Sequence, residues 1–169
     1  MLTEVRFLSV KEARGLRPSI NTAVISILDQ FEENRRSKRL REFKDCLILD
    51  FVDAFERPGD PLWPDQLSVE QHLAACTWEG DRAPELSDAQ QIVQFVHKHH
   101  FSTEPTRLAV HCHAGVSRSA AVAQWVATAH GVPLPQLGDG VHKLDRANPR
   151  VVRLLDKAAV DLRRVPPPT

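Results

Sequence analysis

Short apolar runs, rich in β-branched residues, recur along the chain and alternate with segments of helical periodicity. Residues 22–28 and 45–51 are apolar almost throughout, as in strands that are buried on both faces of a parallel sheet. Residues 5–10 and 107–111 predict two further strands. Strands that alternate with helices indicate an α/β fold, in which helices flank an open, mostly parallel sheet in three layers.

The helical segments carry end signals. A short helix is expected over residues 11–17, and the capping-box spacing at residues 87–90 predicts the start of another. Residues 117–130 are rich in alanine and apolar nearly all round, which predicts a buried helix that Gly131 ends. Asn148 is placed to cap a last helix, because a proline follows it at the first helical position.

Composition excludes several classes of protein. The chain has 169 residues, of which 42% are hydrophobic and 26% charged, so residues 1–165 are expected to form a single domain, with residues 166–169 as a disordered tail. Lys plus Arg (22) balance Asp plus Glu (22), which argues against nucleic-acid or membrane partners and leaves a monomer as the expectation. Three scattered cysteines and an N-terminus unlike a signal peptide favour the reducing cytoplasm.

The most informative segment is the run Cys-His-Ala-Gly-Val-Ser-Arg-Ser at residues 112–119. It follows a predicted buried strand and leads into a predicted helix, with five residues between Cys112 and Arg118. Such a turn collects unpaired backbone N–H groups at a helix N-terminus, where the helix dipole also favours negative charge. The same field favours thiolate over thiol, so the run predicts an oxyanion cradle around a nucleophilic cysteine.

Residues 111–119 resemble the signature loop of the cysteine-dependent protein tyrosine and dual-specificity phosphatases. The similarity is greatest to small bacterial predicted protein tyrosine phosphatases, and it extends to the opening strand and helix, the strand that ends near Asp53, and the stretch that starts at Asn148. This resemblance implies a protein tyrosine phosphatase-like fold. It also implies hydrolysis of phosphate monoesters through a phosphocysteine intermediate, without metal or cofactor.

Each position of the loop has an expected role. Cys112 is the predicted nucleophile, and Arg118 is expected to hold two phosphate oxygens with its guanidinium fork. Gly115 is expected to let backbone approach the phosphate, where a Cβ would crowd it. The resemblance implies that Ser119 eases departure of the cysteine sulfur and that His111 orders the loop and helps ionise the thiol. The expected substrate-binding residues are His113, Ala114, Gly115, Val116, Ser117 and Arg118.

The leaving group needs a proton, and several aspartates are candidates for the general acid: Asp50, Asp53, Asp65 and Asp81. Asp53 is favoured, because it leaves a strand at its carboxyl end, as does an aspartate of the bacterial family. Asp81 has better spacing, 31 residues before Cys112, whereas Asp65 lies 47 residues before it in a Trp-Pro-Asp sequence. That sequence resembles the acid loop of tyrosine-specific phosphatases, so the three assignments stay open.

Two connections are unusual. Residues 31–41 are dense in charge and form either a solvated surface segment or a basic rim that steers a phosphorylated substrate. Residues 58–84, rich in proline and glycine, are long for a connection in a compact domain and are expected to be an insertion near the pocket. The histidine-rich residues 97–100 are expected to be a polar helix end rather than a metal site.

The expected substrate is a phosphorylated protein or a small phosphate ester. The signature loop has no lysine, which favours phosphoproteins over phospholipids, and Phe55, Trp63 or Trp78 could form the apolar wall of the pocket. Two alternatives use the same loop differently. One is a thiolate enzyme of the sulfurtransferase or arsenate reductase type, and the other is a pseudophosphatase that binds phosphate without turnover.

Overall fold

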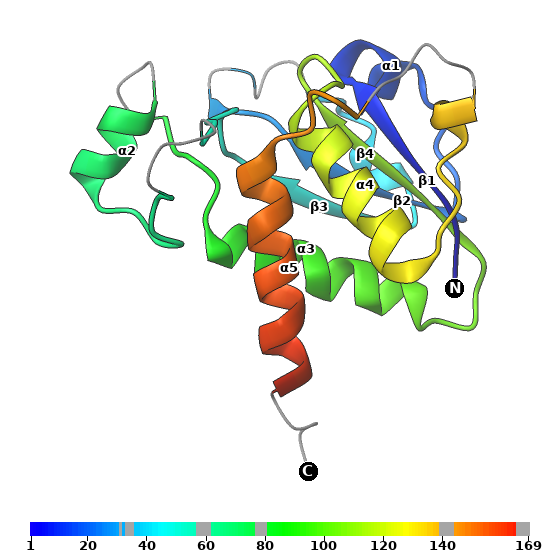
Figure 1. Cartoon of the computed structure of the whole chain (residues 1–169). Coiled ribbons are helices and arrows are strands. Elements are labelled where there is room, and N and C mark those ends of the chain that lie inside the picture. The colour runs from blue at the N-terminus through cyan, green and yellow to red at the C-terminus, as the bar shows by residue number, and fades with distance from the viewer. Residues whose placement is uncertain (31, 33–35, 57–61, 77–80, 139–143, 165–169) are drawn as a thin grey trace.

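The computed structural model describes the whole chain except residues 31, 33–35, 57–61, 77–80, 139–143 and 165–169 (Figure 1). The described strands form one parallel sheet in the order β1-β4-β2-β3. The strands are β1 (Leu2–Ser9), β2 (Thr22–Ile27), β3 (Asp45–Leu49) and β4 (Thr106–Cys112). Because the strands are parallel, their carboxyl ends meet at one edge of the sheet, where ligands bind in folds of this kind.

Helices cover both faces of the sheet. One face packs the main hydrophobic core against α3 (Leu86–His100), α4 (Arg118–His130) and α5 (Pro149–Arg164). The other face carries a smaller apolar cluster beside α1 (Val10–Gly15) and the 3₁₀ turn η2 (Leu40–Glu42). The prediction of a three-layer α/β fold with a mostly parallel sheet is therefore confirmed.

The ends of the long helices follow their sequence signals, with one exception, and the short helix α1 spans Val10–Gly15 rather than the expected residues 11–17. Gly131 ends α4 in the left-handed conformation, with φ of 64°, and the Asn148 side chain accepts a hydrogen bond from the Val151 N–H at the start of α5, 3.2 Å away. The exception is α3, which begins at Leu86 and not after Ser87. Asp88 accepts a hydrogen bond from the Glu85 N–H at 2.9 Å, so the cap lies two residues earlier than the sequence predicted.

The long connection after β3 contains a helix that the sequence pattern did not predict. This helix, α2 (Val69–Ala75), starts at a capping box in which Ser68 and Gln71 bond reciprocally, and it lies apart from the sheet (Figure 1). The predicted tail at residues 166–169 lies outside the described residues. Within the described part of the chain, no helix is both long and apolar enough to cross a membrane.

Candidate active site

Strand β4 ends at Cys112, whose sulfur lies in a turn that closes at the start of α4. The Gly115 N–H donates a hydrogen bond to Sγ at 3.3 Å, and the Ser119 hydroxyl lies 3.2 Å from the same atom. Cys112 and Ser119 are both buried. These two donors and the N-terminus of α4 all stabilise negative charge on the sulfur, so the structure assembles the predicted environment of the nucleophile.

Gly115 is required by a close contact between the loop and the end of β1. Its φ is +74°, and a Cβ at this position would lie 2.3 Å from the Ser9 nitrogen and 2.6 Å from the Leu8 carbonyl carbon. The backbone that comes close to Gly115 is therefore the end of β1. The Val10 N–H also donates to the His113 carbonyl at 3.1 Å, so the junction of β1 and α1 supports the whole loop.

The guanidinium of Arg118 is buried and anchored on one side. Its Nη1 donates to the Phe51 carbonyl at 2.7 Å, which fixes the plane of the group next to Cys112. The Nε–H is buried and has no hydrogen-bond partner among the described residues. Leaving a buried charged donor unsatisfied is costly, so this N–H suits an anion that enters the cradle.

An acidic residue that the sequence analysis did not select also reaches the loop. Glu32 contacts the His113 ring, and its Oε2 lies 3.8 Å from Nη2 of Arg118. Burial, together with the neighbouring Asp29, raises the pKa of Glu32, whereas His113 and Arg118 oppose the rise. Glu32 is thus one described side chain of the charge-dense segment that contacts the loop.

Asp53 contacts the loop at Ser117, the residue that precedes Arg118. Its Oδ1 accepts a hydrogen bond from the Ser117 hydroxyl at 2.6 Å and another from the Asn148 amide at 2.8 Å. Asp53 is exposed, whereas Asn148 is fully buried and also donates to the Ala54 carbonyl at 3.0 Å. Asn148 therefore has two tasks, since it caps α5 with its oxygen and holds Asp53 with its nitrogen. The sequence signalled only the first task.

The other candidate acids interact with groups outside the loop. Asp65 is bound by Lys157 and, at 2.7 Å, by Arg153, and these hydrogen bonds hold the pKa of Asp65 below its ordinary value. Asp50 pairs with Arg82 at 3.2 Å. Asp81 lies near Cys76, where its charge adds to the effect of burial in raising the pKa of that thiol.

The sequence matches the protein-tyrosine phosphatase family over residues 48–132, which is half of the chain and includes both Asp53 and the cysteine loop. The chain belongs to this family. Membership supports phosphatase activity in general, and the matched residues include the whole loop from Cys112 to Arg118.

Among solved structures, the human tyrosine phosphatase-like serine/threonine/tyrosine-interacting protein is similar to this chain. The two sequences are 18% identical, with a TM-score of 0.45, over 84% of this chain and 78% of the human one. No curated protein matches the sequence.

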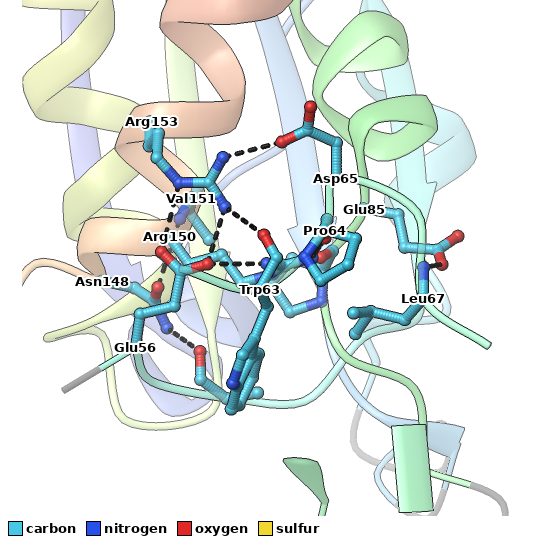
Figure 2. Close-up of polar contacts among 12 residues, drawn as sticks. Glu56, Trp63, Pro64, Asp65, Leu67, Glu85, Asn148, Arg150, Val151 and Arg153 are labelled. Atoms are coloured by element: carbon cyan, nitrogen blue, oxygen red, sulfur yellow. Dashed lines mark hydrogen bonds and ion pairs between the residues drawn. The ribbon is translucent and has the colours of Figure 1, made fainter. Parts of the chain in front are cut away.

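The segment that follows Asp53 is fastened to α5 by two arginines, as Figure 2 shows. Arg150 is fully buried and donates to Glu56 at 2.7 Å, to the Pro64 carbonyl at 2.9 Å and to the Pro84 carbonyl at 2.8 Å. Arg153 donates to Glu56 at 2.6 Å and to the Trp63 carbonyl at 3.2 Å. The Trp-Pro-Asp sequence therefore belongs to a structural network, in which residues 63–65 and Pro84 of the expected insertion bond to the C-terminal helix.

His111 directly precedes Cys112 on β4, so its side chain lies on the opposite face of the sheet from the main core. Burial, with a smaller effect of Arg36, lowers the pKa of His111 to about 4, so the ring is uncharged near neutral pH. Any effect of His111 on the cysteine must therefore arise from packing or dipoles and not from a positive charge.

The thiol of Cys46 has its pKa raised to about 11 by burial, which makes it a poor nucleophile.

The histidine-rich end of α3 packs against the end of α4. The rings of His97 and His100 lie 5.2 Å and 4.6 Å from that of His130, which itself contacts Trp125 at 5.3 Å. His99 is buried and bonds to Asp45 at 3.1 Å. Within the described residues, no group of histidines, cysteines and carboxylates has the arrangement to hold a metal ion.

This histidine cluster predicts a loss of stability in acid. Burial, and then the charges of His100, His97 and Arg163, lower the pKa of His130 from 6.5 to about 4. Between these values the unfolded chain binds a proton that the folded chain does not, so the free energy of unfolding should fall as pH decreases through this window. Urea denaturation at about pH 7 and about pH 4.5 measures the effect.

The variant His130→Phe keeps an aromatic ring against Trp125 and removes the proton-binding site. It should lose less stability than the wild type between the two pH values, although His111 contributes to the loss in both proteins. An equal loss in the variant and the wild type would contradict the assignment.

Proposed function

We propose that this protein is a cysteine-dependent phosphatase that hydrolyses phosphate monoesters through a phosphocysteine intermediate. The observation that supports the proposal most directly is the buried Cys112 sulfur between the Gly115 N–H and the Ser119 hydroxyl, within the match to the family. In the first step the thiolate attacks phosphorus, the S–P bond forms, and the ester oxygen leaves with its electron pair and accepts a proton. In the second step water attacks phosphorus, the S–P bond breaks, and inorganic phosphate leaves.

The cradle suits both steps. Arg118, fixed by the Phe51 carbonyl, is placed to hold equatorial phosphate oxygens and to stabilise the charge that spreads over them in the transition state. The Ser119 hydroxyl next to the sulfur stabilises the thiolate that leaves the phosphoenzyme. These roles need no metal ion or other cofactor.

Asp53 is the general acid in this proposal. Ser117 and Asn148 both donate to its Oδ1, which orients the carboxyl group at the rim of the loop. Asp53 protonates the leaving oxygen in the first step and accepts a proton from water in the second. Asn148 acts through Asp53 as a positioning residue.

Substitution of the acid should affect poor leaving groups most. Asp53→Asn keeps the side-chain shape and should slow the cleavage of phosphotyrosine and alkyl phosphates by about 100-fold, the usual contribution of a general acid. Esters of very acidic phenols, such as a dinitrophenyl phosphate, should react at nearly the wild-type rate. The pH–rate profile of the variant should also lose its basic limb.

Asp65→Asn and Asp81→Asn are the matched controls. Asp65→Asn weakens ion pairs with Arg153 and Lys157, so it should reduce stability without this dependence on the leaving group. If Asp53→Asn cleaved all esters at the wild-type rate, and Asp81→Asn were slow only with poor leaving groups, Asp81 would be the general acid.

The proposed substrate is a phosphorylated protein, with phosphotyrosine favoured. Phe55 is 44% exposed and follows Asp53 by two residues, while Val116 in the loop is 36% exposed. Ser117, which follows Val116, bonds to Asp53, so the two apolar side chains belong to segments that meet at this hydrogen bond, and they suit an aromatic ring. Phosphoserine or phosphothreonine could also enter, as in dual-specificity enzymes. The free state of all three cysteines supports action in a reducing compartment such as the cytoplasm.

One experiment separates the proposal from its alternatives. The protein is incubated with an aryl phosphate, the reaction is quenched in acid, and the protein is digested. The mass of the peptide that contains Cys112 is then determined by mass spectrometry. A phosphorylated Cys112 peptide, steady release of the phenol and inhibition by vanadate are expected. Phosphate binding without release of the phenol would indicate a pseudophosphatase, and a persulfide on Cys112 after treatment with thiosulfate would indicate a sulfurtransferase.

A further inference from the structure

A hollow lies on the sheet face that α3, α4 and α5 do not cover. It measures about 250 Å³ and is bounded by β1, β2 and β4, by the residues that follow α1, and by Phe43. In the strand register Glu4 lies beside Arg107, and Arg6 lies beside Ala109. Side chains alternate along a strand, so these four residues share the face that carries the smaller apolar cluster.

The rim of the hollow is strongly basic. Three arginines line it, namely Arg6, Arg17 and Arg107, against a single carboxylate, Glu4, which pairs with Arg6 at 3.2 Å. Within the described residues, neither Arg17 nor Arg107 has an ion-pair partner. Two guanidinium groups therefore face the hollow without a compensating negative charge.

Arg107 is unusual for its place in the fold. It lies on β4, which is a central strand of the parallel sheet, where both faces are ordinarily covered and apolar. Its side chain is nevertheless exposed at the mouth of the hollow. Packing of the sheet does not require an arginine at this position, so its charge calls for a separate explanation.

The floor of the hollow is apolar. Leu8, Leu16, Phe43 and Ala109 form it, and Ala109 contributes depth because it is the small residue on the central strand. An apolar floor beneath several guanidinium groups is complementary to a molecule with one apolar end and one anionic end. Guanidinium forks bind carboxylates and phosphates bidentately, and an aromatic or aliphatic body would displace water from the floor.

We infer that this hollow binds a small organic anion, which has an apolar body and a carboxylate or phosphate group. The volume is slightly below that of ordinary ligand sites, so the body is the size of one aromatic ring. The site is separate from the signature loop, because Arg107 and Cys112 are five residues, or about 17 Å, apart along β4. The inference does not depend on the activity of Cys112.

Nuclear magnetic resonance of methyl-labelled protein tests the inference without relying on turnover. The probes are phenylphosphonate and benzoate, which carry both a ring and an anion and are not hydrolysed. Both should cause saturable shifts of the Ala109 and Leu16 methyl signals. Shifts of the Gly115 amide report binding to the signature loop separately, so occupancy of the two sites is not confused.

Removal of one guanidinium should weaken this binding. Arg107→Gln should raise the dissociation constant of phenylphosphonate for the hollow about tenfold, as expected for a lost charge-assisted hydrogen bond at a partly exposed site. Arg17→Gln should have a similar effect. Because Arg17 lies outside the strands, this variant still tests the inference if Arg107→Gln does not fold. Arg163→Gln on α5 is the matched control and should leave the dissociation constant unchanged.

Three results would overturn the inference. They are the absence of saturable methyl shifts, equal affinity in both arginine variants and the wild type, and equal affinity for benzyl alcohol, which has the ring without the charge. Inorganic phosphate should bind the hollow more weakly than phenylphosphonate, because it makes no use of the apolar floor. Equal affinity for the two would remove the argument for an apolar body.

Discussion

Replacement of Cys112 with serine is expected to abolish turnover, with kcat reduced by at least about 10⁴-fold, as is typical when a covalent nucleophile is lost. The hydroxyl is not ionised near neutral pH and has a similar shape, so the Gly115 N–H and Arg118 remain in place to bind an anion. Phosphate affinity, measured by calorimetry, should therefore stay close to that of the wild type.

Cys46→Ser and Cys76→Ser serve as controls for that variant. Burial raises the pKa of both thiols, and neither residue belongs to the loop, so both variants should keep wild-type kcat. Appreciable turnover by Cys112→Ser would refute the covalent mechanism.

Replacement of Arg118 with lysine should lower kcat by about 10³-fold although the positive charge is conserved. The guanidinium bonds to the Phe51 carbonyl with one nitrogen while its buried Nε–H remains for a phosphate oxygen. An ammonium group is a point charge without this fork, and it cannot satisfy the carbonyl and two phosphate oxygens in the same geometry. Steady-state kinetics with an aryl phosphate measure the loss.

Vanadate affinity provides a second measurement on Arg118→Lys. Vanadate imitates the five-coordinate arrangement of the transition state, so its affinity should fall in parallel with kcat, whereas the affinity for phosphate should fall less. A variant that keeps full activity would show that Arg118 contributes charge alone.

Sequence reasoning succeeded where the information is local. The apolar runs predicted the four described strands, and the loop from Cys112 to Arg118 is contiguous, so its turn, glycine and following helix can be inferred from adjacent residues. Helix α2 escaped prediction because its surroundings are dominated by proline and glycine, although the pair Ser68 and Gln71 carries a capping signal.

Contacts between distant segments could not be inferred in this way. Asp53 and Asn148 are separated by 95 positions, and their hydrogen bond depends on how α5 docks beside the loop. Glu32 reaches His113 from the connection after β2, where the pattern of charges predicted a solvated surface segment or a basic rim and gave no sign of this contact. The reason for Gly115 also depends on β1, which is a neighbour of β4 in the sheet and remote in sequence.

The buried Arg150 has a consequence for the order of events during synthesis. It joins α5 to partners that lie 66, 86 and 94 positions earlier in the chain. Contacts of such separation form late in folding, and on the ribosome they form only after the C-terminal helix has emerged. A nascent chain that already contains Cys112 and Arg118 still lacks Asn148 and the anchor of the Asp53 segment, so these contacts around the loop form only after α5 has left the ribosome.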